Sequence, residues 1–213
     1  MHCPSCEHRL ELGATRCETC GFQLDQLDQR YGNQDFRLEQ ITDTTKFLRG
    51  SDKLAVQEVI DEFETQFPQF FPTFFIGQLP ANNKLSEFAS WMLNHGRIHV
   101  LGELRNSENT FLFVIDLTSR SITVSVGYFA EHYVSENDLR ELLSDAIPFL
   151  ASGDVREALE KLVDDLRLVL KRNHRLLLKH LKSNEDKAPH TEKQADAQVT
   201  ETTQTASSGQ TPQ

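Results

Sequence analysis

The residues best suited to chemistry are four cysteines near the start of the chain. They form two Cys-x-x-Cys pairs, Cys3 with Cys6 and Cys17 with Cys20, and the chain has no other cysteine. This spacing lets each pair turn both sulfurs toward one ion, and four thiolates suit the tetrahedral geometry of zinc. Because the protein supplies all four ligands, no coordination position is open for a substrate. The spacing therefore predicts one structural zinc ion.

The two alternatives for these cysteines are a pair of disulfides and an iron site. Disulfides belong to oxidising compartments, and the first residues carry no apolar core of a secretory signal, so a pair of disulfides is disfavoured. A four-thiolate site also accepts iron, as in rubredoxin, and iron remains the alternative metal. His2 and His8 lie nearby, but four thiolates complete the site without them.

Residues 1–24, with Cys-Pro-Ser-Cys followed by Cys-Glu-Thr-Cys-Gly, resemble the short zinc ribbons at the N-termini of many bacterial proteins. Such ribbons often have glycine after the second cysteine of each pair; Gly21 keeps it, whereas Glu7 replaces it. The resemblance implies contact with a protein or with nucleic acid. We expect protein contact, because acidic residues balance the basic ones here: Glu7, Glu11 and Glu18 against Arg9 and Arg16.

Length and charge narrow the classes of function. The chain has 213 residues, enough for one domain with appendages, and a formal net charge of -10. That charge disfavours a protein that coats nucleic acid or an anionic membrane. The sequence also holds no uninterrupted apolar stretch of membrane-spanning length, and the expected compartment is the cytoplasm.

Apolar periodicity predicts seven elements after the ribbon. Helices are expected at 52–67, 83–95, 135–147 and 154–170, and strands at 72–79, 111–115 and 121–126. Gly96 is expected to end the second helix in a left-handed conformation, and Pro148 to end the third. Ser135 with Asp138 predicts a capping box.

The two later strands differ in their apolar pattern. Residues 111–115 are apolar throughout, which is typical of a central strand covered on both faces, whereas 121–126 alternate. The short segment between them predicts an antiparallel hairpin. The fold class is therefore α/β, with α+β as the alternative: a zinc ribbon followed by a mixed sheet flanked by helices on both faces.

The composition along the chain predicts four parts. Residues 1–24 are the ribbon, 25–37 a polar linker, 38–182 the main domain and 183–213 a disordered tail. The tail is rich in Thr, Gln, Ser and Glu and nearly free of bulky apolar residues, so it cannot bury enough surface to offset the entropy of ordering.

The main domain carries a set of residues in a recognisable order. Asp43 precedes a helix that ends in Phe63-Glu64, and Arg120 precedes an alternating strand followed by Gly127-Tyr-Phe-Ala-Glu131. From residue 41 to about 172 the chain resembles the TPM domain, found in a thylakoid-lumen phosphatase-like protein, a photosystem II repair protein and many bacterial membrane-associated proteins. The resemblance implies a mixed sheet between helices.

Two positions depart from that family's pattern. Ser119 stands where an acidic residue usually precedes the arginine, and Phe129 stands where glycine usually follows the tyrosine. The resemblance therefore does not carry over a catalytic activity.

A second candidate site contains Asp43, Asp116, Arg120 and Glu131. If one sheet edge gathers them, the carboxylates could bind Ca²⁺ or Mg²⁺ while the arginine orients a phosphate oxygen, as a metal-dependent phosphatase requires. Ordinary structural roles fit the same residues: a capping Asp43, a hairpin-end Asp116 and an Arg120–Glu131 pair. The chain has no glycine-rich phosphate loop and no Gly-x-Ser-x-Gly motif to strengthen catalysis.

The function expected from these features is a non-catalytic zinc-binding adaptor with a protein partner of unknown identity. The alternatives are a divalent-metal-dependent phosphatase and a nucleic-acid-binding protein. Nucleic acid or a membrane surface would have to contact the ribbon or the basic segment 171–182. Positive charge at a helix C-terminus is an equally good explanation of that segment.

Overall fold

The computed structural model describes residues 2–11, 14–80, 83–100 and 102–185, with side chains to residue 175. Two compact units divide the chain, Met1–Arg175 and Leu176–Gln213. The described residues form five α-helices and two mixed sheets, which confirms the expected α/β class. No helix among them is both long and apolar enough to cross a membrane.

The larger sheet has four strands in the order β2-β3-β6-β7. Its first three strands run parallel and the last is antiparallel: β2 (Ile41–Asp43), β3 (Phe71–Gly77), β6 (Thr110–Asp116) and β7 (Ser121–Val126). The expected hairpin of the last two strands is confirmed, with Phe111 opposite Val126 and Asp116 opposite Ser121. A smaller sheet joins three short strands, β1 (Phe36–Glu39), β4 (Gly96–Val100) and β5 (Glu103–Leu104).

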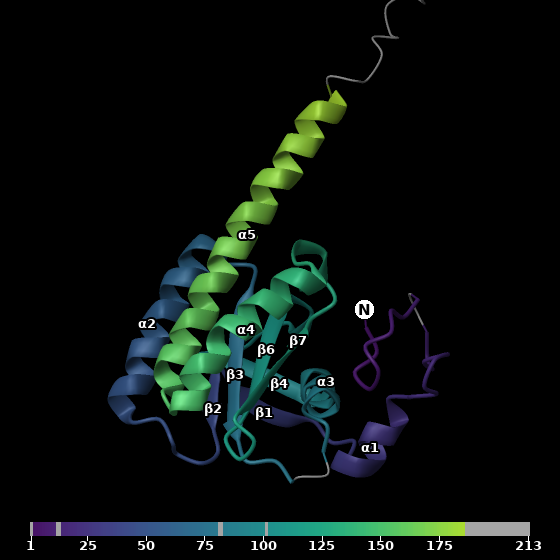
Figure 1. Ribbon diagram of the computed structural model, residues 1–213, viewed down its shortest axis with the longest axis vertical. Coiled ribbons are helices and arrows are strands. Elements are labelled where there is room, and N and C mark those ends of the chain that lie inside the picture. The colour runs from purple at the N-terminus through teal and green to yellow at the C-terminus, as the bar shows by residue number, and fades with distance from the viewer. Residues whose placement is uncertain (1, 12–13, 81–82, 101, 186–213) are drawn as a thin grey trace, which may run out of the picture. The chain divides into compact units, whose positions relative to one another are not determined.

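Helices cover both faces of the four-stranded sheet (Figure 1). Three pack on one face: α2 (Gly50–Gln66), α4 (Glu136–Ser152) and α5 (Val155–Glu185). On the other face lie α3 (Leu85–His95) and the small sheet. A short helix, α1 (Asp25–Tyr31), precedes β1.

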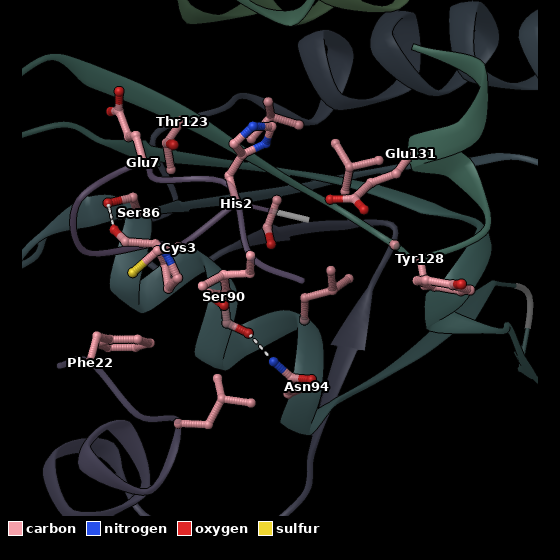
Figure 2. A pocket seen from close by; sticks show the side chains of 18 of the residues that line it. His2, Cys3, Glu7, Phe22, Ser86, Ser90, Asn94, Thr123, Tyr128 and Glu131 are labelled. Carbon is pink, nitrogen blue, oxygen red and sulfur yellow. Dashed lines mark hydrogen bonds between the residues drawn. The ribbon is translucent and has the colours of Figure 1, made fainter. Parts of the chain in front are cut away.

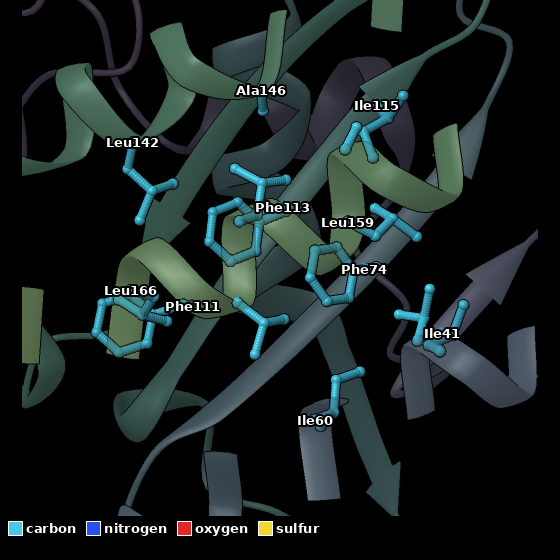
Figure 3. Packing of buried hydrophobic residues seen from close by; sticks show 14 of the residues in the cluster. Ile41, Ile60, Phe74, Phe111, Phe113, Ile115, Leu142, Ala146, Leu159 and Leu166 are labelled. Atoms are coloured by element: carbon cyan, nitrogen blue, oxygen red, sulfur yellow. The ribbon is translucent and has the colours of Figure 1, made fainter. Parts of the chain in front are cut away.

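Strand β6 lies at the centre of the core, as its apolar run predicts. All seven of its residues are buried. Because side chains alternate along a strand, Phe111, Phe113 and Ile115 pack with α2, α4 and α5 (Figure 3). Leu112 and Val114 contribute to the second cluster, with Met92 of α3 and Leu38 of β1 among its members.

The expected capping box begins α4. Ser135 Oγ accepts from the backbone N of Asp138 at 3.1 Å, and Asp138 Oδ2 accepts from the backbone N of Ser135 at 2.9 Å. Asp138 also accepts from Arg172 and Asn173 of α5. The cap therefore joins the two helices as well as starting one.

Pro148 does not end α4, contrary to the sequence-based prediction. The helix continues to Ser152 and ends at Gly153, whose φ is 88°. Pro148 itself is exposed, whereas Leu150 is buried. Packing of the last turn therefore outweighs the loss of the backbone hydrogen bond that proline cannot donate.

Gly96 does not take the left-handed conformation expected of it. Its φ of -72° and ψ of 122° are extended, and β4 follows α3 without a turn. A Cβ at this position would lie 2.4 Å from Leu38 Cδ1 and 2.5 Å from the carbonyl oxygen of Met92. The close approach of β1, rather than a turn, requires the glycine.

The segment expected to be a linker, 25–37, contains α1 and the first residues of β1. The basic segment 171–182 lies within α5. Of the expected disordered tail, residues 183–185 form the end of α5, and 186–213 lie outside the described residues.

Candidate metal centre

The two cysteine pairs occupy equivalent backbone turns. In the first, the carbonyl oxygen of Cys3 accepts from the backbone N of Glu7 at 2.8 Å, and in the second that of Cys17 accepts from Gly21 at 2.8 Å. Cys3 N donates to His8 and Cys17 N donates to Phe22 in the same manner. Each turn therefore aims a pair of sulfurs at one point.

Glu7 and Gly21 occupy the same position in these turns. Both have left-handed backbones, with φ of 62° at Glu7 and 74° at Gly21. Glycine adopts this conformation freely, whereas a residue with a Cβ is strained there. The missing glycine of the first pair thus leaves the turn intact and adds strain to it.

The four sulfurs form one cluster. Their Sγ atoms all lie within 4.8 Å of one another, with 3.6 Å between Cys3 and Cys20 and 3.6 Å between Cys6 and Cys17. A tetrahedral ion with Zn–S bonds of about 2.3 Å holds its sulfurs about 3.8 Å apart. All four cysteines are free thiols, so the cluster fits a tetrahedral four-thiolate metal site.

The thiols of the cluster ionise unequally. The backbone amide of Cys20, with help from that of Thr19, outweighs burial and lowers the pKa of Cys17 to about 6. The backbone amide of His8 favours the Cys6 thiolate, but burial and the neighbouring thiols outweigh it and raise the pKa of Cys6 to about 12. The Cys17 thiolate therefore forms readily, whereas that of Cys6 needs a nearby cation to neutralise its charge.

The ribbon rests on helix α3. Ser86 Oγ donates to the carbonyl oxygen of Pro4 at 2.7 Å, and Lys84 Nζ donates to that of Ser5 at 2.9 Å. The buried Cys3 and Cys17 share an apolar cluster with Phe22 and Leu27, and Trp91 of α3 packs against it. Helix α3 therefore supports the cluster of four cysteines.

The segment after the ribbon strengthens this attachment. His95 Nε2 of α3 lies 2.8 Å from Asp28 Oδ1 of α1, and Arg30 of α1 pairs with the buried Glu87 at 2.9 Å. Trp91 Nε1 donates to the carbonyl oxygen of Gly32 at 2.8 Å. Sequence reasoning missed this docking role of α3; the one signal for it was a single tryptophan at the border of the helix's apolar face.

Asp43 and Asp116 lie at the same edge of the large sheet, as expected. They pair in register with Ile76 and Gly77, so they flank the carboxyl end of β3. Adjacent strands are about 4.8 Å apart, so the two backbones are separated by about 10 Å. Arg120 follows Asp116 in the hairpin turn, and its Nη1 donates to the carbonyl oxygen of Ala151 at 2.7 Å.

Both carboxylates accept hydrogen bonds from their own loops. Asp43 accepts from Thr45 N at 3.0 Å, Thr45 Oγ1 at 2.8 Å and Leu48 N at 2.9 Å. Asp116 accepts from Leu79 N, Thr118 N and both donors of Ser119. Burial disfavours its charge, but these donors outweigh burial and lower the pKa of Asp116. Asp116 therefore takes the expected hairpin-end role, whereas Asp43 holds the loop before α2 and does not cap that helix, whose N-cap is Arg49.

Glu131 lies at the opposite end of the sheet. Strand β7 returns antiparallel, so Gly127 donates to Thr110 at the start of β6, and Glu131 follows in the short 3₁₀ helix Ala130–Tyr133. The length of β6, from Thr110 to Asp116, separates this end from the acidic edge. The structure thus brings together Asp43, Asp116 and Arg120 but not Glu131. Ion or phosphate binding at that edge stays a prediction.

A model of the protein family described as the TPM domain matches residues 41–169 of the chain. A search among curated proteins found no match.

Three solved structures are similar in part. The N-terminal domain of the cg2496 protein from Corynebacterium glutamicum has 15% identity and a TM-score of 0.48, covering 63% of this chain and 82% of that one. The BA42 protein from Bizionia argentinensis has 10% identity and a TM-score of 0.49, covering 61% and 86%. An N-terminal domain from P. gingivalis has 18% identity and a TM-score of 0.45, covering 70% and 91%.

The family model spans more than half of the sequence and includes the four-stranded sheet, α2, α3 and α4. The ribbon precedes it and contributes the cluster of four cysteines. The chain therefore belongs to the TPM domain family and carries in addition an N-terminal four-cysteine site.

Proposed function

We propose that this protein is a non-catalytic adaptor: the four cysteines hold one structural zinc ion, and the ribbon and the TPM domain together present a surface to a protein partner. The observation that supports it most is the cluster of four sulfurs within 4.8 Å of one another, in a ribbon packed on α3. Zinc would fix two turns that contain little apolar surface of their own.

The acidic edge of the sheet favours this role over phosphatase activity. Asp43 and Asp116 each accept at least three hydrogen bonds from the protein, which leaves fewer oxygens to bind a cation. Among the described residues, the cysteines form the one cluster of potential metal ligands. A structural ion and a hydrogen-bonded acidic edge suit a binding protein.

Elemental analysis of the purified, reduced protein tests the metal. One zinc per chain is expected, and Cys17→Ser should lose it, whereas the matched change Ser90→Ala on α3 should keep it. Iron in place of zinc, which visible absorbance would reveal, would correct the metal assignment. Metal-free protein with mutual disulfides would reject the zinc site.

An assay of phosphomonoester hydrolysis tests the absence of catalysis. With Mg²⁺ or Ca²⁺ present, the wild type and Asp43→Ala should show the same background rate. Metal-dependent turnover that Asp43→Ala abolishes would show instead that the sheet edge is an active site, and the adaptor role would be wrong.

A further inference from the structure

Strand β7 is the outer strand of the four-stranded sheet, and in the described part of the chain no strand pairs with its free edge. Gly127 N donates to Thr110 O, so in the antiparallel ladder Ser125 and Thr123 also bond to β6. The alternate residues therefore point their N–H and C=O groups away from β6. These residues are Ile122, Val124 and Val126.

A cavity of about 660 Å³ runs along this edge. Residues 123–128 line it, together with residues of α3, α4 and the ribbon. Figure 2 shows His2 and Glu7 of the ribbon, Ser86 and Ser90 of α3 and Thr123 of β7 at the same pocket. The free strand edge thus faces an open groove rather than packed core.

The walls of this groove offer two kinds of contact. Leu139 and Leu143 of α4, with Leu93 of α3, provide apolar surface. Four glutamates line the groove, Glu7, Glu108, Glu131 and Glu136, against two arginines, Arg16 and Arg140, and Arg140 pairs with Glu136 at 2.5 Å. The chain as a whole has a net charge of -10, so a basic ligand is favoured over an acidic one.

We propose that the groove binds an extended, basic peptide segment of a partner protein, which adds as a fifth strand beside β7. This inference rests on the proposed adaptor role and names the chemistry of its partner. Unpaired groups that recur at every second residue match an extended backbone, which presents its own donors and acceptors at the same period. Main-chain hydrogen bonds supply affinity, and the apolar and acidic walls select the side chains.

The probe is a fluorescein-labelled hexapeptide, Lys-Val-Lys-Thr-Lys-Val, titrated by anisotropy into the full-length, zinc-loaded protein. Two further versions carry N-methyl groups on odd or on even residues. Since only alternate amides of an added strand face β7, one version should bind about tenfold more weakly and the other almost normally. Equal binding of all three, or no binding of the unmodified peptide, would overturn the proposal.

Val124→Pro removes one outward N–H, and Val124→Ala is its control because it shortens the side chain but keeps that N–H. Proline should lower affinity by about tenfold and alanine by less than about threefold. Hydrogen exchange should show peptide-dependent protection at Val124 and Val126 of the wild type, which tests the site without a variant. Protection elsewhere would place the peptide at a different surface and overturn the proposal.

A glutamate version of the peptide tests the charge, since it should bind more weakly than the lysine version. Equal affinity for the lysine and glutamate peptides would contradict the proposal that the partner segment is basic. Zinc is measured on the same samples. If the protein contains one zinc but binds no peptide, the groove proposal is rejected and the zinc proposal is not. If the protein is metal-free and still binds the peptide, only the zinc proposal is rejected.

Discussion

At the scale of single residues, Glu7 replaces the glycine that short zinc ribbons often have after the second cysteine of a pair, and its backbone is strained as a result. It has the backbone conformation of its counterpart Gly21, although it has a side chain. Glu7→Gly should relieve about 1 kcal/mol, because a left-handed residue with a Cβ costs that much relative to glycine. Zinc release to a competing chelator should then require about fivefold more chelator.

Gly21→Ala is the opposite change in the equivalent turn. Its Cβ would lie 3.2 Å from Arg16 Nη2 and would share the strain of a φ of 74°. This variant should release zinc at a lower chelator concentration than the wild type. If both variants behave like the wild type, the two turns do not govern metal retention.

The charged side chain of Asp138, which connects α4 to α5, should make the stability of the fold depend on pH. Burial raises the pKa of this carboxyl, but donors from Ser135, Asn173 and Arg172 outweigh burial and lower it. A lowered pKa stabilises the fold above the unfolded value of about 3.9, and that stability is lost as pH falls through the folded pKa. Asp138→Asn should therefore reduce stability by about 1–2 kcal/mol at neutral pH and progressively less below pH of about 4.

Urea unfolding at a series of pH values measures the difference in unfolding free energy between the wild type and Asp138→Asn. Glu141→Gln is the control, because Glu141 is an exposed carboxylate of the same helix with one hydrogen bond, from Asn137. Its stability should follow the wild type within about 0.5 kcal/mol at each pH. If the stability difference between Asp138→Asn and the wild type stays constant with pH, the charge of Asp138 is not the stabilising feature.

At the scale of elements, sequence patterns predicted the features that depend on residues close together in the chain. The apolar run of β6, the alternation of β7 and the cap at Ser135 each depend on neighbours in sequence, and each is confirmed. The short strands β1, β4 and β5 were not predicted. β1 pairs with β4 across about sixty residues of sequence, with Phe36 opposite Gly96, so no local pattern specifies the pairing.

Gly96 was assigned the wrong role for the same reason. A glycine after a helix usually ends it, but here β1 passes too close for any side chain. Gly96→Ala should destabilise the protein by about 1–3 kcal/mol, because Leu38 or the end of α3 must move. Gly50→Ala is the control: nothing lies within 4 Å of its added Cβ, so urea unfolding should show no loss. Equal stability of both variants would mean that β1 moves aside freely.

At the scale of the whole molecule, the sequence predicted the cluster of four cysteines better than the acidic edge. Cysteine spacing is local, and the structure brings all four sulfurs together. The acidic edge depends on strand direction: β2 and β6 end at the same edge, on either side of β3, whereas β7 returns and carries Glu131 to the other end. The contact between ribbon and α3 depends on residues far apart in sequence, such as Ser86 and Pro4, 82 positions apart, which no periodicity reveals.

That contact should make the single tryptophan of the chain a reporter of the proposed zinc. Trp91 packs against the cluster that contains Cys3 and Cys17. Removal of zinc by a chelator should loosen the turns and expose the indole, which shifts its emission to longer wavelength. The core of β3 and β6 contains no metal ligand, so far-ultraviolet circular dichroism should change little.

Cys17→Ser tests whether this shift reports the metal. Without chelator it should emit at the long wavelength of the stripped wild type, and added zinc should not reverse the shift. The wild type should return to its short wavelength when zinc is restored, because the ribbon then packs on α3 again. A loss of most helical signal on chelation would show that the metal supports the whole fold. No shift at all would show that the ribbon stays docked through its contacts with Ser86 and Trp91 alone.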